Sequence, residues 1–208
     1  VIVPFYGYAR QDKKHRGREP ISARLMADLF KAAGADRLMT VDLHTSQIQG
    51  FFDGPVDHLF ALPLLAEHVA SRVATDQITV VSPDAGRVRV AERWTDVLGA
   101  PLAIIHKRRD PDVPNQVRVF EVVGDVKNRV CVVVDDMIDT GGTIVKAAET
   151  LFENGAKDVI VAATHGILSD PARDRLQQSQ ISEVVVTDTL PIPPERQFDK
   201  LTVLSIAP

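Results

Sequence analysis

The chain has 208 residues, of which 45% are hydrophobic and 25% charged, and its formal net charge is −4 at pH 7. These proportions are ordinary for a globular protein, and the acidic balance argues against a nucleic-acid partner, which selects for basic surfaces. The single cysteine, Cys131, lies in an apolar run and excludes a framework of intramolecular disulfides. No apolar run reaches the length of a membrane span. We therefore expect a cytoplasmic protein with no nucleic-acid or membrane partner.

Both ends of the sequence lie in apolar runs, at residues 1–5 and 201–206. Natural chain termini are usually solvated and seldom lie in core strands. We therefore expect this sequence to be part of a longer chain that continues at both ends.

Apolar runs of strand length alternate with amphipathic stretches, which predicts an α/β fold with mostly parallel sheets flanked by helices. The first helix is expected over 20–33, where it begins at Pro20 and stops at Gly34. Further helices are expected after the strands at 78–82 and 130–134, and from Asp170-Pro171 onward. The predicted strands after the opening run are 37–43, 78–82, 101–105, 130–134, 158–163, 183–187 and 201–206.

One pattern occurs twice: a helix, a Gly-Ala turn, an aspartate, an apolar strand and a histidine. In the first copy His44 follows Gly34 by ten residues, and in the second His165 follows Gly155 by ten. A duplicated α/β unit would produce this repeat and predicts two related domains. We expect the incomplete first domain at 1–61, the second at 62–194, and a tail at 195–208 that returns toward the first.

The most informative segment lies between the predicted strand at 130–134 and the helix that follows it. Ligands of open α/β sheets gather at the carboxyl ends of strands, where this segment falls. Its glycines and threonines would offer backbone amides and hydroxyls at a helix N-terminus, an arrangement that binds phosphate. Its aspartates suit sugar hydroxyls or a metal ion. The segment comprises Asp135, Asp136, Asp139, Thr140, Gly141, Gly142 and Thr143.

This segment resembles the phosphoribosyl-binding signature of the type I phosphoribosyltransferase fold. That fold serves transferases that consume phosphoribosyl diphosphate and the synthetases that make it. The resemblance implies that residues 139–143 hold the phosphate of ribose 5-phosphate, and that Asp135 and Asp136 hold its 2- and 3-hydroxyls or a Mg²⁺ ion.

Two other motifs are similar to the phosphoribosyl diphosphate synthetase family. Arginine can clamp phosphate oxygens and an amide can bind a purine edge, so Arg10 and Gln11 suit ATP, although a solvated basic loop would also explain them. In the family, the matching stretch contacts ATP through Arg10, Gln11 and Asp12. The segment around His44 resembles the family's histidine segment, which implies a contact to Mg²⁺ and ATP.

The residues after the strand at 78–82 resemble the family's diphosphate loop, which makes Asp84 a metal contact and implies Mg²⁺ as the cofactor. Arg87 departs from this pattern, because typical members place a second glycine there. Phosphate oxygens beside carboxylates repel one another by several kcal/mol at about 4 Å and an effective dielectric near 20, so a cation is needed.

A basic segment follows the predicted strand at 101–105 and opens a polar stretch over 106–116. It resembles the family's mobile arm, in which Lys107 and Arg109 close on the reacting phosphates. Cations there would neutralise charge that develops during phosphoryl transfer. A further set of residues resembles the family's regulatory loop, which binds phosphate or ADP. An exposed charged loop would explain this set almost as well. The set is Lys13, Lys14, Arg16 and Ser46.

The resemblance runs along the whole chain and implies an enzyme that moves the diphosphate of ATP onto the 1-hydroxyl of ribose 5-phosphate, for nucleotide biosynthesis. It also implies a homohexamer built from dimers. Alternatives are a phosphoribosyltransferase, a non-catalytic regulatory homologue that binds nucleotide, and an incomplete chain that folds without turnover. The intact Lys107 and Arg109 count against the regulatory homologue. No residue is clearly placed as a general base.

Overall fold

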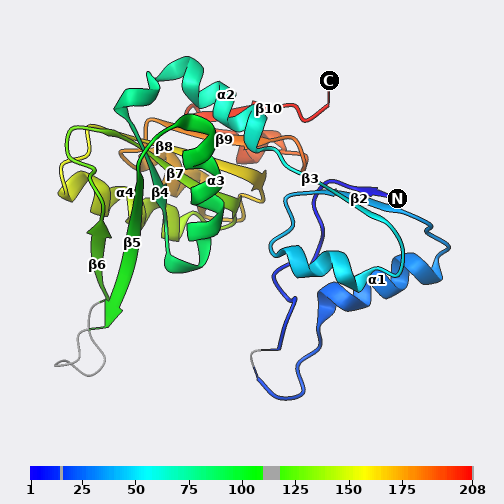
Figure 1. The fold of residues 1–208 in the computed structure, drawn as a ribbon. Coiled ribbons are helices and arrows are strands. Elements are labelled where there is room, and N and C mark those ends of the chain that lie inside the picture. The colour runs from blue at the N-terminus through cyan, green and yellow to red at the C-terminus, as the bar shows by residue number, and fades with distance from the viewer. Residues whose placement is uncertain (15, 110–117, 208) are drawn as a thin grey trace. The chain divides into compact units, whose positions relative to one another are not determined.

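The computed structural model describes residues 1–14, 16–109 and 118–207. The chain divides into two compact units, Val1–Ala61 and Leu62–Pro208, and each has its own sheet (Figure 1). Within the described residues, no helix combines the length and apolar character needed to cross a bilayer.

Unit 1 contains a three-stranded parallel sheet in the order β1-β2-β3. These strands are Ile2–Val3, Leu38–Val41 and Val56–Leu59, accompanied by helix α1, Ser22–Ala32, and a 3-10 helix at Ser46–Phe51. The helix expected over 20–33 is therefore present. Strand β2 is shorter than the expected 37–43, because Asp42 adopts a positive φ of 39° and the chain leaves the sheet there. The Tyr6 hydroxyl donates a buried hydrogen bond of 2.8 Å to the Ala23 carbonyl, which fixes α1 to the core.

Unit 2 is built on a seven-stranded sheet in the order β10-β9-β8-β7-β4-β5-β6. All neighbouring strands are parallel except β5 and β6. The mostly parallel α/β architecture expected from the sequence is therefore confirmed. The strands are β4 Ile78–Ser82, β5 Leu102–Arg109, β6 Arg118–Val123, β7 Val130–Ile138, β8 Asp158–Gly166, β9 Glu183–Thr187 and β10 Leu201–Leu204.

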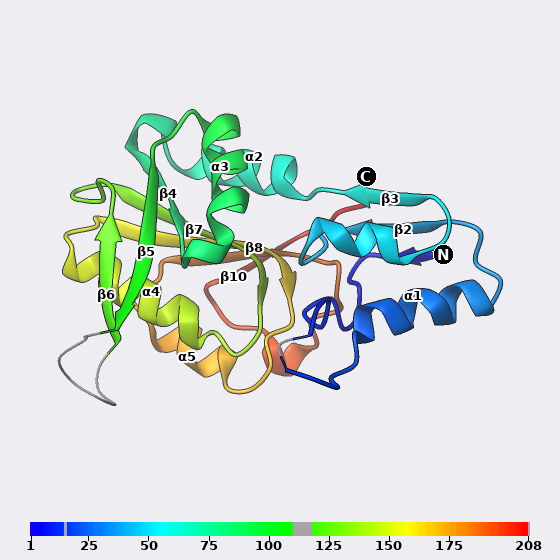
Figure 2. The same ribbon diagram turned by 60° about the horizontal axis from the view of Figure 1, so that its bottom comes forward.

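Helices cover both faces of this sheet (Figure 2). Helices α2, Leu62–Arg72, and α3, Val88–Leu98, lie on one face, and α4, Gly142–Glu153, and α5, Ala172–Gln178, lie on the other. Strands buried on both faces read as continuous apolar runs, and β7 begins with one, Val130–Val134, which is fully buried. This explains why the central strands could be recognised in the sequence.

The segment over 195–208, expected as a tail toward the first domain, contains β10. This strand pairs in parallel with β9, with Leu201 opposite Val184, and so completes the sheet of unit 2.

The two copies of the sequence repeat share one turn geometry. In unit 1 the Ala35 amide donates to the Phe30 carbonyl at 3.0 Å, and in unit 2 the Ala156 amide donates to the Leu151 carbonyl at 3.0 Å. The intervening glycines have φ angles of 92° and 86°, in the left-handed region that closes helices. The histidines differ, however, because His44 follows its strand whereas His165 lies inside β8 and is 1% exposed.

Candidate functional site

Strands β4 and β7 of unit 2 are parallel neighbours, so the segments that follow them emerge at the same edge of the sheet. Their pairing ends at Val81 and Val133, whereas β7 continues beside β8 as far as Ile138. The strand predicted at 130–134 is therefore longer than expected. As a consequence, Asp135 and Asp136 lie on the strand itself, in the stretch that extends past β4.

Arg87, from the loop after β4, lies against both of these aspartates. Its Nε is 2.9 Å from the Asp135 Oδ1, and its Nη2 is 2.8 Å from the Asp136 Oδ1. The three side chains are only 16%, 18% and 5% exposed, so water screens these contacts little. The sequence places Arg87 and these aspartates in two different motifs. In the structure, the Arg87 guanidinium joins the two motifs. We call Asp135 and Asp136 the acid pair.

The electrostatics of the acid pair disfavour two full negative charges. Burial raises the pKa of Asp135 well above its usual value, and the neighbouring carboxyl of Asp136 raises it further. The charge of Arg87 and the Asp136 amide, which donates to the Asp135 Oδ1 at 2.8 Å, act in the opposite direction. Arg87 is therefore the charged group that opposes the rise in the pKa of Asp135.

The predicted phosphate loop leads from β7 into the first turn of α4. Gly141 is the residue before this helix and has a φ of 72°, and it has no side chain that could cap the first turn. A β-carbon placed on Gly141 would approach Leu176 of α5 to 3.3 Å. Arg175 of α5 donates from Nη1 to the Thr140 carbonyl at 3.1 Å. Helix α5 therefore supports the loop from outside and restricts its backbone conformation.

The amides of the first α4 turn have no intrahelical acceptors and suit an anion. Thr140 and Thr143 are exposed, while Asp139 and Gly142 are half-buried. The seven residues singled out between 135 and 143 thus form one strand-to-helix connection.

Asp84 has a structural task in its own loop. Its Oδ1 accepts a hydrogen bond of 2.8 Å from the Gly86 amide, and its carbonyl accepts one of 2.7 Å from the Ser82 hydroxyl. These contacts close the turn that delivers Arg87 to the acid pair. The assignment of Asp84 as a metal contact stays a prediction.

Lys107 and Arg109 belong to β5, which is longer than the strand predicted at 101–105 because it pairs with β6 in an antiparallel ribbon. Their side chains, and residues 110–117 of the predicted polar segment, lie outside the described part of the structure. The catalytic role of these two residues stays a prediction.

In unit 1 the predicted nucleotide-binding segments contact each other. The buried Asp12 carboxylate accepts hydrogen bonds from the Thr45 hydroxyl at 2.6 Å and the Gln47 side-chain amide at 2.7 Å. It therefore holds the segment that follows His44. The His44 side chain itself is half-buried.

Sequence reasoning missed His58 of β3, which supports the other side of the same segment. Its Nε2 accepts a hydrogen bond of 2.9 Å from the Leu43 amide. Asp42 also anchors the segment, because its carboxylate accepts a bond of 2.9 Å from the Ala61 amide. Both contacts depend on strand pairing between β2 and β3, which no local sequence motif announces.

The remaining predicted residues of unit 1 lie at the surface. The Arg16 amide donates to the Glu19 carboxylate at 3.1 Å, and the Ser46 carbonyl accepts from the Gln49 side chain at 3.1 Å. The exposed residues of the predicted ATP and regulatory sets are Arg10, Gln11, Lys13, Lys14, Arg16 and Ser46.

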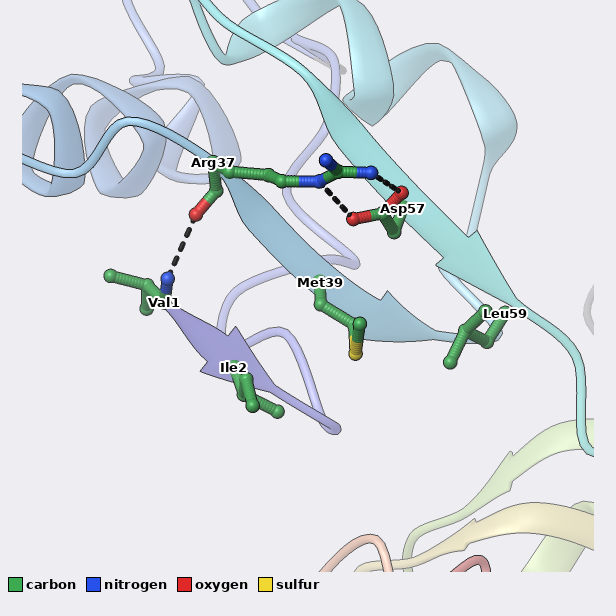
Figure 3. Close-up of a pocket in the computed structure, with 6 residues that line it drawn as sticks. All are labelled: Val1, Ile2, Arg37, Met39, Asp57 and Leu59. Carbon is green, nitrogen blue, oxygen red and sulfur yellow. Dashed lines mark hydrogen bonds and ion pairs between the residues drawn. The ribbon is translucent and has the colours of Figure 1, made fainter.

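A pocket on the sheet of unit 1 contains none of the predicted site residues (Figure 3). In it, Arg37 of the β2 approach donates to Asp57 of β3 at 2.7 Å, and the Val1 amine donates to the Arg37 carbonyl at 2.8 Å. Its lining is Val1, Ile2, Arg37, Met39, Asp57 and Leu59.

The acid pair also offers the oxygen ligands that Mg²⁺ prefers. Among the described residues, no three His, Cys, Asp or Glu side chains gather as a metal ion held by protein alone would require. Magnesium in phosphate-transfer sites is commonly held by one or two carboxylates together with substrate oxygens. The donor set therefore fits a Mg²⁺ ion that arrives with a phosphorylated substrate.

Comparison with known proteins gives a consistent assignment. Residues 1–34 match the N-terminal domain of ribose phosphate pyrophosphokinase, and residues 110–207 match the phosphoribosyl synthetase-associated domain. The chain is 76% identical over 208 residues to the ribose-phosphate pyrophosphokinase of Streptomyces avermitilis, and 64% identical over 209 residues to that of Mycobacterium tuberculosis. Each comparison covers the whole chain and 64% of the relative's length.

A solved structure agrees with these relatives. The crystal structure of phosphoribosylpyrophosphate synthetase from Mycobacterium smegmatis superposes with a TM-score of 0.91 at 62% identity. The match covers 99% of this chain and 66% of the solved one.

Proposed function

Because the chain belongs to the ribose-phosphate pyrophosphokinase family, we propose that the whole protein transfers the diphosphate of ATP to the 1-hydroxyl of ribose 5-phosphate. The products are 5-phosphoribosyl 1-diphosphate and AMP. The observation that supports this most directly is the connection from β7 to α4, which combines two carboxylates with a glycine-opened helix N-terminus. A sugar phosphate requires both groups, one for its hydroxyls and one for its phosphate.

The phosphate of ribose 5-phosphate would bind the amides and hydroxyls of residues 139–143. Backbone donors at a helix N-terminus stabilise an anion without needing a charged side chain. The 2- and 3-hydroxyls would donate to Asp135 and Asp136, since ionised carboxylates only accept hydrogen bonds. Sugar and phosphate would thus be bound by consecutive parts of one connection.

The ATP contacts that the resemblance implies are Arg10, Gln11, Asp12 and His44, all in unit 1, and Asp84 in unit 2 for the metal. The exposed Arg10 and Gln11 suit direct contacts. The buried Asp12, with its two bonds to Thr45 and Gln47, suits a supporting role better. Mg²⁺, when bound with ATP, would neutralise phosphate charge.

In the reaction, the 1-hydroxyl oxygen forms a bond to the β-phosphorus of ATP. The bond from that phosphorus to the oxygen bridging the α-phosphate breaks, AMP leaves with the electron pair, and the hydroxyl proton passes to solvent. Lys107 and Arg109 would neutralise charge on the transferred phosphates, and positioning of the two substrates would supply much of the acceleration.

The same resemblance supports a cytoplasmic enzyme of nucleotide biosynthesis that forms a homohexamer built from dimers. The exposed Lys13, Lys14, Arg16 and Ser46 would bind regulatory phosphate or ADP at a subunit contact. Sedimentation with and without phosphate would test the assembly.

One assay separates the proposed reaction from its main alternative. We expect the full-length protein to release AMP from ATP only when ribose 5-phosphate and Mg²⁺ are present. A phosphoribosyltransferase would instead consume phosphoribosyl diphosphate with a base and release diphosphate. Release of diphosphate without AMP formation would exclude the proposed function.

A further inference from the structure

The acid pair has an internal cation. Arg87 contacts Asp135 through Nε and Asp136 through Nη2, so one planar guanidinium spans both carboxylates. Both contacts are close ion pairs at a site with little exposure to water, so this guanidinium compensates the charge of both carboxylates at once.

The backbone of two segments, the turn after β4 and the end of β7, places Arg87 and the acid pair beside each other. Arg87 is the residue that precedes α3, and its amide donates to the Asp84 carbonyl at 3.3 Å within the turn after β4. The acid pair lies on the stretch of β7 beyond Val133, the last residue of β7 that pairs with β4. The guanidinium therefore comes from the loop after β4 and contacts β7 in the stretch where β4 no longer pairs with it.

A charged group this well buried has a large effect on its neighbours. Two adjacent carboxylates with little exposure repel each other, and removal of a buried counterion leaves that repulsion uncompensated. Such a site either takes up a proton or binds another cation. The identity of that cation is restricted to small ions with a preference for oxygen ligands.

We propose that Arg87 is the resident counterion of the acid pair: it aligns both carboxylates for the sugar hydroxyls and takes the place of a divalent cation before substrate binds. The part that concerns the sugar rests on the proposed function. The part that concerns the cation does not, because it is a property of the substrate-free protein. Arg87 is thus a positioning residue that acts through Asp135 and Asp136.

Binding of Mn²⁺ to the substrate-free, full-length protein, followed by electron paramagnetic resonance, tests the cation. We expect Arg87→Gln to bind Mn²⁺ at least about tenfold more tightly than the unchanged protein, since a tenfold change needs only about 1.4 kcal/mol. Arg89→Gln is the matched control, because Arg89 is an exposed arginine two residues away in α3. The double variant Arg87→Gln/Asp136→Asn should lose the gain.

Equal Mn²⁺ affinity in Arg87→Gln and the unchanged protein would overturn the proposal, and so would an equal gain in Arg89→Gln. Arg87→Lys keeps a positive charge beside the acid pair, although an ammonium does not reproduce the spanning contact, and its gain in Mn²⁺ affinity is expected to stay well below tenfold. A tenfold gain in that variant would also overturn the proposal.

Calorimetric binding of ribose 5-phosphate tests the sugar part. Without divalent cations, Arg87→Gln should bind ribose 5-phosphate about tenfold more weakly than Arg89→Gln, and Mn²⁺ should restore binding. Loss that Mn²⁺ does not restore would contradict the positioning role. Failure of the unchanged protein to bind ribose 5-phosphate would reject the proposed function, while the Mn²⁺ result in substrate-free protein would stand.

Discussion

The Asp12 carboxylate accepts a hydrogen bond of 2.6 Å from the Thr45 hydroxyl, although 33 positions separate the two residues. The same oxygen accepts the Gln47 side chain. The loop after β1 and the segment after β2 are therefore joined, and the position of the segment that follows His44 depends on the buried Asp12.

Replacement of Asp12 tests this dependence. Asp12→Ala leaves two donors without their acceptor, so we expect unit 1 to lose about 1–3 kcal/mol of unfolding free energy. Amide hydrogen exchange of residues 43–47 should accelerate, as measured by mass spectrometry. Asp36→Ala, at an exposed aspartate, is the control. Unchanged exchange in this segment, combined with weaker ATP binding, would instead make Asp12 a direct ATP contact.

The environment of Glu183 in β9 predicts that unit 2 loses folding stability as the pH becomes acidic. Burial by itself raises the pKa of this carboxyl, but hydrogen bonds from Thr202 and His68 outweigh burial and lower the pKa below its usual 4.5. The Thr202 hydroxyl lies 2.7 Å away, His68 Nε2 lies 3.0 Å away, and Arg72 adds a charge at 3.5 Å. The cluster joins α2, β9 and β10.

The sign of the pH effect follows from that lowered pKa. Glu183 binds a proton more readily in the unfolded chain, so its stabilisation is complete above pH 4.5 and is lost as the pH falls through the lower folded value. Urea denaturation between pH 3 and 7 should show this loss, and Glu183→Gln should flatten the curve below about pH 5. Glu149→Gln, on the exposed surface of α4, should keep the original slope. The same slope in both variants would show that Glu183 does not carry the effect.

Replacement by alanine should affect stability and ligand binding differently at the two adjacent glycines of the phosphate loop, Gly141 and Gly142. Gly141 has a φ of 72° and would place a β-carbon 3.3 Å from Leu176, whereas a β-carbon on Gly142 would meet only the flexible end of Arg175 at 3.4 Å. We expect Gly141→Ala to cost about 1–2 kcal/mol and to weaken ribose 5-phosphate binding strongly. Gly142→Ala should cost less stability. Thermal denaturation and calorimetry would measure both, and equal losses would contradict the backbone argument.

The sequence could predict elements whose signals are local. Strand β9 was expected at 183–187 and occupies these residues, and α1, expected over 20–33, occupies Ser22–Ala32. Strand β6 was missed, because Arg118 and Glu121 interrupt its apolar residues and leave it without the continuous apolar run of a central strand. Helix α2 and the short strand β3 were missed as well.

The site shows the same limit. The aspartates and glycines of residues 135–143 could be found from their types and spacing. The contact of Arg87 with the acid pair could not, since it depends on where β4 and β7 stop pairing. Nor could the contact of His58 with Leu43, which requires the register of β2 and β3. Tertiary register, rather than residue type, determines these contacts.

Arg175 offers a last test of the phosphate loop, because it holds the loop through the Thr140 carbonyl rather than through the expected phosphate donors. Arg175→Ala removes this support from an exposed position, so the melting temperature should change little. Ribose 5-phosphate binding should weaken about three- to tenfold, because a less ordered loop pays more entropy on binding. Arg173→Ala is the matched control, because Arg173, the other exposed arginine of α5, donates to the Gln197 carbonyl instead. If both variants bind ribose 5-phosphate equally well in calorimetry, the loop does not need its external support, and the first turn of α4 is preorganised by Gly141 alone.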